Sequence, residues 1–175
     1  MAIDESLPFR AIRIALMTVS DTRTAQDDTS GDILAQRIEA AGHTLAARII
    51  ERDDATHIAE RLHNWIDDPD VDAIVTTGGT GLTGRDVTPE ALGRVKEKDI
   101  PGFGELFRWL SYKSIGTSTV QSRACAVVAR GTYIFALPGS NGAVKDGWDG
   151  ILAEQLDSRN RPCNFVELMP RLRER

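Results

Sequence analysis

The sequence predicts an α/β fold: a single domain with a mostly parallel central sheet that is covered by helices on both faces. Two observations predict it. Apolar runs of strand length alternate with amphipathic segments of helix length. The 175 residues suit one domain, and a hydrophobic fraction of 41% is enough for a core. We expect this core to span about 10–157 and a polar tail to occupy 158–175.

The first half of the chain alternates strand and helix. Residues 12–19 form an apolar run, typical of a buried strand, and the helix after it has Ser30 or Thr29 as its expected N-cap and ends at Gly42. A strand, a helix with one apolar stripe that Pro69 stops, and a strand that runs into glycines follow, at residues 44–51, 54–69 and 71–77.

The second half begins with a helix over 88–95, for which Thr88 is the expected N-cap and Pro89 the first helical residue. The pattern then predicts a helix within 102–116, two strands within 124–139 joined at Gly131, and a helix over 143–156. We expect the tail to form an edge strand and a frayed end.

Composition excludes several classes of protein. A net charge of −5 argues against a nucleic-acid partner or a membrane surface, and no apolar run approaches the ~18 residues that span a bilayer. The first ten residues carry two acids and no apolar core, so we expect no signal peptide. Cys125 and Cys163 lie far apart, which predicts a reduced, cytoplasmic protein without a disulfide or thiolate metal site.

The segment after the third strand, GGTGLTGRD, nearly matches two phosphate-binding motifs. Gly79 to Gly84 fit the dinucleotide pattern G-x-G-x-x-G, but the next helix starts too late, and the motif follows the third strand instead of the first. The same stretch fits the start of a P-loop, but Arg85 and Asp86 stand where Lys and Ser/Thr belong.

A carboxylate beside phosphate is repelled unless a cation lies between them. We therefore interpret the glycine amides as a cradle for an oxyanion and Asp86 as a ligand of the accompanying Mg²⁺. The alternative is an ordinary turn in which Asp86 caps the next helix or pairs with Arg85. The density of glycines, hydroxyls and carboxylates favours the functional interpretation.

Other polar residues follow strands that end at the same edge of the predicted sheet, where α/β proteins bind ligands. Asp53 or Asp54 is a second candidate metal carboxylate, although either can simply cap the helix that follows. The remaining candidates, each with a turn, a cap or plain surface as its alternative, are Ser20, Asp21, Ser122, Arg123, Pro138, Gly139 and Ser140.

Together the segments DDTSGD, TTGGTG, GRDVTPEAL, GTSTVQSRA and LPGSNGA resemble the molybdenum-cofactor biosynthesis domain of the MoaB and MogA proteins, which gephyrin and the plant Cnx proteins also carry. The resemblance runs from about residue 13 to about residue 152. It implies a three-layer α/β/α sandwich, assembly as a homotrimer or homohexamer, and Mg²⁺-dependent adenylylation of molybdopterin by ATP in molybdenum cofactor biosynthesis.

The resemblance also implies roles for individual residues. Asp53 and Asp86 correspond to the family's two essential acids, as catalytic and metal-binding residues. Gly78, Gly79, Thr80, Gly81 and Arg85 would bind the nucleotide and its phosphates. The pterin side would be lined by Ser20, Asp21, Ser122, Arg123, Pro138, Gly139 and Ser140.

Two positions resemble the MoaB branch more than the MogA branch. MogA-type relatives usually carry Pro-Lys after the LPG turn and a bulkier residue before Arg-Asp, whereas this chain has Asn141-Gly142 and Gly84. The MogA-type activity is the firmer one. An alternative function is therefore a molybdopterin or nucleotide carrier without turnover.

Overall fold

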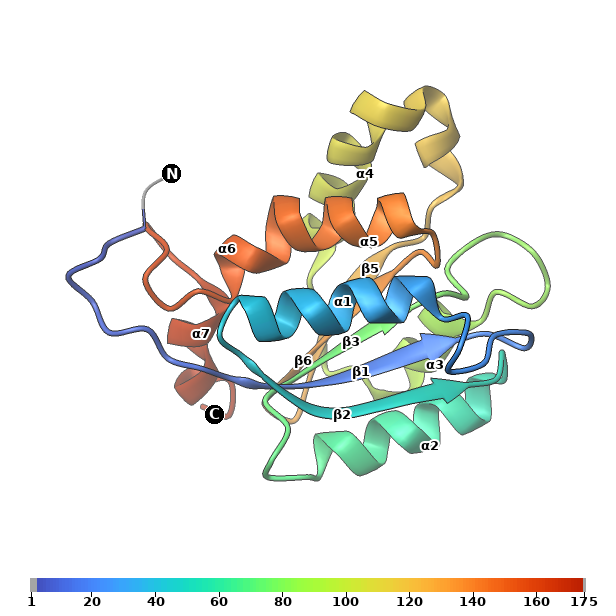
Figure 1. The fold of residues 1–175 in the computed structure, drawn as a ribbon. Helices are drawn as coiled ribbons and strands as arrows, with labels where there is room; N and C mark the ends of the chain where they lie inside the picture. Colours follow the sequence, from blue (N-terminus) through green and yellow to red (C-terminus); the bar gives the residue numbers. More distant parts are fainter. Residues whose placement is uncertain (1–2, 175) are drawn as a thin grey trace.

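The computed structural model describes residues 3–174 as an α/β/α sandwich, as predicted (Figure 1). One six-stranded sheet has the order β2-β1-β3-β6-β5-β4. The pairs β1–β2, β1–β3 and β3–β6 are parallel, and β5 pairs antiparallel with β6 and β4. The strands are β1 Arg13–Val19, β2 Thr44–Glu51, β3 Ala73–Thr77, β4 Lys98–Asp99, β5 Cys125–Ala129 and β6 Thr132–Leu137.

Helices cover both faces of the sheet (Figure 1). The α-helices are α1 Thr29–Ala40, α2 Ala55–Ile66, α3 Thr88–Val95, α4 Pro101–Ile115, α5 Asn141–Gly147, α6 Ala153–Gln155 and α7 Phe165–Leu168. A 3₁₀-helix, η1 Gly116–Gln121, follows α4; a π-helical stretch, η2 Trp148–Leu152, joins α5 to α6; and a second 3₁₀-helix, η3 Met169–Arg171, follows α7. Among residues 3–174, no helix is long and apolar enough to cross a bilayer.

Side chains alternate along the strands, so each face of the sheet has its own core. In β1, Ile14 and Leu16 pack in a cluster with α1, α4 and α5, whereas Ala15 and Met17 pack with α2 and α3. Burial on both faces explains why the inner strands read as continuous apolar runs. The two cores bury both faces of the sheet, so the loops at its edge are attached to a well-packed base.

Three details differ from the sequence predictions. Asp28, not Thr29 or Ser30, caps α1 by accepting a hydrogen bond from the Gly31 amide at 3.0 Å. Thr88 is the first residue of α3 instead of its cap, because its hydroxyl donates to the Gly78 carbonyl at 2.9 Å. The short edge strand β4 was not predicted.

The prediction of an edge strand in the tail is wrong for the part that the structure describes. The tail contains α7 and η3, and only one isolated bridge joins Asn160 to Ile3. Val166 is buried in the core cluster of α1, α4 and α5, and Phe165 packs against it. These apolar contacts make a helix more favourable than a strand here.

Candidate functional site

The parallel register brings three predicted loops together at one edge of the sheet. Thr18 of β1 lies beside Thr77 of β3, which in turn lies beside Leu137 of β6. The Gly78 amide donates to the Leu137 carbonyl at 2.9 Å, and a Cβ atom on Gly139 would lie 3.3 Å from the Gly78 Cα. The glycine loop and the LPGS turn therefore touch at the centre of the site.

Gly78 and Gly79 give the loop its sharp change of direction. Both have positive φ, 102° and 63°, a conformation that side chains disfavour. A Cβ atom on Gly78 would lie 2.2 Å from the Val19 carbonyl oxygen, so only glycine fits against the end of β1. Within residues 3–174, the amides of Gly79 and Thr80 donate to no acceptor. These two donors are available to an oxyanion, whereas the Gly78 amide, which the sequence also suggested for this role, donates to Leu137 instead.

Thr80 has a second free polar group. Its side chain is 2% exposed, and its hydroxyl has no hydrogen-bond partner in the described part of the chain. A buried hydroxyl without a partner is costly, and ligand-binding sites are where such groups are expected. Thr80 therefore offers both an amide and a hydroxyl to a ligand.

Asp86 is held by its own loop. Its Oδ2 accepts from the Thr83 amide at 2.8 Å and the Thr83 hydroxyl at 2.7 Å, and the hydroxyl bond is the main reason that its pKa lies below the ordinary value. The alternative roles as helix cap or partner of Arg85 are not observed, because α3 has no side-chain cap and Arg85 pairs with Asp21. Asp86 is therefore ionised at neutral pH, and the two bonds from Thr83 orient its carboxylate.

Arg123 acts as a clamp on the same loop. Its guanidinium donates to the carbonyls of Gly81 at 2.7 Å and Asp86 at 2.6 Å, and it forms an ion pair with Glu90. Its backbone amide also donates to the Thr80 carbonyl at 3.0 Å. The structure thus directs Arg123 toward the loop backbone, which supports the residues that would contact a ligand.

Asp53 and Asp54, the two adjacent acids that follow β2, accept different hydrogen bonds. Asp54 caps α2 by accepting from the amides of Thr56 at 2.8 Å and His57 at 3.0 Å. Within the described residues, the Asp53 carboxylate accepts one hydrogen bond, from the Asp21 amide at 3.1 Å. Burial raises the pKa of Asp53, and the charges of Asp21 and Asp86 raise it further. The sequence alone did not separate these acids; the structure leaves Asp53 uncommitted.

The residues around Asp53 fit a Mg²⁺ ion that the protein holds only in part. Among the described residues, the charges of Asp21 and Asp86 repel Asp53, and Arg85, which pairs with Asp21, partly offsets them. Within residues 3–174, no group of three acidic, histidine or cysteine side chains is arranged as a complete metal site. Mg²⁺ commonly takes one or two carboxylates and completes its shell with water and substrate phosphates. The donor set matches that case.

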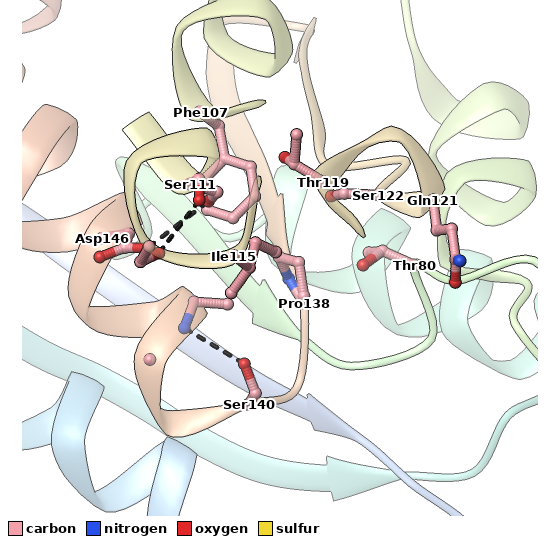
Figure 2. A pocket seen from close by; sticks show the side chains of 14 residues that line it. Thr80, Phe107, Ser111, Ile115, Thr119, Gln121, Ser122, Pro138, Ser140 and Asp146 are labelled. Atoms are coloured by element: carbon pink, nitrogen blue, oxygen red, sulfur yellow. Dashed lines mark hydrogen bonds between the residues drawn. The ribbon is translucent and has the colours of Figure 1, made fainter. Parts of the chain in front are cut away.

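A cavity of about 260 Å³ opens beside the glycine loop, between α4–η1 and α5 (Figure 2). Five predicted site residues line it: Thr80, Gly81, Ser122, Pro138 and Ser140. The other lining residues were not predicted: Phe107, Ser111, Ser114, Ile115, Thr119, Gln121, Gly142, Ala143 and Asp146. A helical spacing of four links Phe107, Ser111 and Ile115, which is the signal that could have revealed this wall.

Several predicted residues lie outside the cavity wall. Ser20 accepts from the amides of Thr22 and Arg23 at 3.2 and 3.1 Å, which is the turn role left open by the sequence. Gly139 accepts from Arg23 through its carbonyl at 2.9 Å. Asp53 and Asp86 lie at the rim of the glycine loop, so the site has an acidic rim and a separate, mostly apolar cavity.

This geometry agrees with comparisons to known proteins. Residues 15–158 match the family described as "Probable molybdopterin binding domain". The chain belongs to this family. It is 48% identical over 160 residues to Molybdenum cofactor biosynthesis protein B of Escherichia coli (strain K12), covering 91% of this chain and 94% of the relative. The protein of the same name from Bacillus subtilis (strain 168) is 41% identical over 146 residues, covering 83% and 86%.

Solved structures support the same assignment. The crystal structure of the tungsten cofactor synthesizing protein MoaB from Pyrococcus furiosus is similar, with a TM-score of 0.78 and 32% identity, covering 94% of this chain and 99% of that one. The molybdopterin biosynthesis Mog protein from Mycobacterium ulcerans has a TM-score of 0.77 and 29% identity, covering 93% and 99%. The relatives confirm the resemblance to the MoaB/MogA family and support a role in molybdenum cofactor biosynthesis.

Proposed function

We propose that this protein transfers an adenylyl group from ATP to molybdopterin in a Mg²⁺-dependent reaction. The observation that carries the proposal is that Asp53 and Asp86 both lie against the glycine loop. A Cβ atom on Gly79 would lie 3.1 Å from Asp53 Oδ1, and one on Gly81 would lie 2.8 Å from Asp86 Oδ2. Both carboxylates thus lie directly against the loop whose free amides are suited to bind an oxyanion.

The charge balance of the rim suits a metal–nucleotide complex better than a bare anion. Free phosphate would meet the repulsion of Asp53, Asp21 and Asp86, with Arg85 as the offsetting cation. Asp53 and Asp86 are the residues that would hold Mg²⁺, with phosphate oxygens of ATP completing its shell. Bound Mg²⁺ would supply the positive charge that neutralises the nucleotide phosphates.

In the proposed reaction, a terminal phosphate oxygen of molybdopterin forms a bond to the α-phosphorus of ATP. The bond from that phosphorus to the bridging oxygen breaks, and pyrophosphate leaves with the electron pair. Such transfers depend on positioning and charge stabilisation more than on proton transfer. The amides of Gly79 and Thr80 would hold a phosphate oxygen, the Thr80 hydroxyl would donate to another, and Arg123 would keep the loop in place.

The test uses purified protein with Mg-ATP and molybdopterin, with adenylylated pterin and pyrophosphate as products. We expect Asp53→Asn and Asp86→Asn each to lower turnover at least about 100-fold while pterin binding persists. Asp54→Asn is the matched control, because asparagine caps a helix as well as aspartate does and, within residues 3–174, the hydrogen bonds of the Asp54 carboxylate go to its own helix. Wild-type turnover in Asp86→Asn would contradict the proposal. Tight pterin binding without ATP consumption by the wild type would support the carrier function.

We further propose that the chain forms a homotrimer or homohexamer. The helix α4 and η1 project from the body of the molecule and carry large exposed apolar side chains (Figure 1). These are Leu106, Trp109, Tyr112, Ile115 and Val120, of which Val120 is 79% exposed. A surface of this kind is typical of a protein interface. Light scattering of the wild type and of Trp109→Lys tests it, because a monomeric wild type would contradict the proposal.

A further inference from the structure

The cavity beside the glycine loop is chemically asymmetric. Of the described residues that line it, Asp146 alone carries a charge, and the others are apolar side chains, hydroxyls, amides and glycines. Figure 2 shows Asp146 on one side of the cavity, with Thr80 and Gln121 on the other. A ligand in the cavity therefore meets a carboxylate at one end and the free donors of Thr80 at the other.

Asp146 has hydrogen-bonding capacity to spare. Its Oδ2 accepts from the hydroxyl of the buried Ser111 at 3.5 Å, a long contact, and within residues 3–174 it has no cation within 4.0 Å. A ligand that fills the cavity removes water from this carboxylate. The loss of hydration free energy is large unless the ligand supplies hydrogen-bond donors of its own. Two N–H groups side by side match a carboxylate best.

We propose that Asp146 recognises the 2-amino-4-oxopyrimidine edge of the pterin and thereby sets which ring system the cavity accepts. This inference rests on the proposed function. The ring N3–H and the 2-amino N–H of a pterin lie next to each other and point the same way, so each can donate to one carboxylate oxygen. An adenine ring instead presents a donor beside an acceptor, and a phosphate group would repel the carboxylate.

The rest of the cavity suits the same orientation. Phe107, Ile115 and Pro138 give it apolar surface for the body of a fused ring, and the buried ring of Phe107 makes this wall firm. With its pyrimidine edge on Asp146, the pterin would extend its phosphate-bearing arm toward Thr80 and Gly81. The polarity of the cavity thus directs the attacking phosphate to the loop that carries Asp86.

The experiment compares two ring systems that differ at this edge. Pterin carries a 2-amino group, whereas lumazine carries a 2-oxo group and presents a donor beside an acceptor. We expect the wild type to bind pterin at least about tenfold more tightly than lumazine in a fluorescence titration. Asp146→Asn replaces one acceptor by a donor. We expect this variant to lose at least about tenfold in pterin affinity and to prefer lumazine, or to bind both equally.

Controls separate recognition from folding and from turnover. Asp149→Asn removes a charge three residues further on, where the side chain pairs with Arg37 outside the cavity, and we expect wild-type ring selectivity. Equal unfolding temperatures of the Asp146 and Asp149 variants show an intact fold. Unchanged pterin selectivity in Asp146→Asn, or no selectivity in the wild type, overturns the inference even if adenylylation occurs. Loss of AMP affinity in place of pterin affinity also overturns it. If pterin binding depends on Asp146 but no adenylylation occurs, the proposed adenylyl transfer is wrong and the recognition by Asp146 stands.

Discussion

Asp28 and Asp53 both lie near the carboxyl edge of the sheet, yet their surroundings are opposite. Asp28 is fully buried and accepts hydrogen bonds from Arg48 at 2.9 Å, Thr18 at 2.7 Å and the Gly31 amide at 3.0 Å. Asp53 is half-buried, accepts one amide and faces other carboxylates. Burial would raise the pKa of both acids, but the donors around Asp28 outweigh it and hold that pKa below the ordinary value.

The difference distinguishes an acid that supports the structure, Asp28, from an acid that is available to bind a ligand, Asp53. The cluster around Asp28 is closed: Arg23 pairs with Asp28 at 3.3 Å and also donates to the Gly139 carbonyl at 2.9 Å, so it ties the LPGS turn to the start of α1. The rim around Asp53 is open, because Asp21 and Asp86 repel its negative charge and Arg85 offsets this repulsion only in part. A site that binds a cation needs such unmatched charge, and it is stable only on a rigid support.

The largest expected effect breaks the closed cluster. We expect Asp28→Asn to destabilise the protein by about 3 kcal/mol, a fall of roughly 6–12 °C in Tm, because Arg48 and Arg23 lose their buried negative partner. Thermal unfolding measures it. Asp32→Asn is the control: Asp32 also pairs with Arg48, at 2.7 Å, but is half exposed, so we expect a change within about 1 kcal/mol. Equal losses in the two variants would show that the buried cluster has no special role.

Removing the charge of Asp53 in the open rim should raise the free energy of unfolding instead of lowering it. We expect Asp53→Asn to stabilise the ligand-free protein by about 0.5–1 kcal/mol at neutral pH, since it removes the repulsion from Asp21 and Asp86. The same variant should lose turnover. Urea unfolding without nucleotide measures the gain, and Asp54→Asn, which keeps its cap, should show no gain. A loss of stability in Asp53→Asn would mean that the rim is structural.

The sequence predicted these two regions unequally, for physical reasons. Apolar runs and amphipathic spacing reflect burial, so β1, β2, β3, β5, β6 and the helices α1 to α5 could be anticipated, whereas α7 was not. Asp28 was missed as a cap because Thr29 and Ser30 are equally good caps, and its choice depends on Arg48, which is 20 residues away. Asp53 was favoured over Asp54 only through the family resemblance, since both suit a helix N-terminus.

The cavity wall was beyond sequence reasoning for another reason. Phe107 and Ser111 look like ordinary residues of the helix α4, and they become a wall only when α4 packs beside α5. Asp146 looks like a solvent-facing acid on α5. Motifs identify residues held near one another along the chain, such as the glycine loop, whereas the cavity depends on contacts between distant helices.

The pH dependence of stability sharpens the comparison. The folded pKa of Asp28 lies below the ordinary 3.8, so its stabilisation is complete above that value and is lost as pH falls through the folded pKa. The folded pKa of Asp53 lies above 3.8, so its contribution is favourable below that value and is lost as pH rises through the folded pKa. We therefore expect Asp53→Asn to match the wild type below pH 3.8, to exceed it as pH rises through the folded pKa of Asp53, and to keep that excess at neutral pH.

The matching experiment is urea unfolding of the wild type, Asp53→Asn and Asp28→Asn at pH values from well below 3.8 up to about 7. The deficit of Asp28→Asn should shrink only at the acidic end, where Asp28 of the wild type becomes protonated. The difference curves of the two variants should therefore change in separate pH windows. A single shared window would contradict the assignment of opposite pKa shifts to the two acids.

The smallest expected effect comes from two glycines of the same loop. A Cβ atom on Gly84 would meet nothing within 4 Å, whereas one on Gly81 would lie 2.8 Å from Asp86 Oδ2, the movable end of a side chain. We expect both alanine variants to stay within about 0.5 kcal/mol of the wild type in unfolding. Only Gly81→Ala should lower turnover, at least about tenfold, because it displaces Asp86. Full turnover in Gly84→Ala would show that a side chain at this branch-specific position does not itself decide activity, and equal losses in both variants would mean that loop flexibility, not the placement of Asp86, limits the reaction.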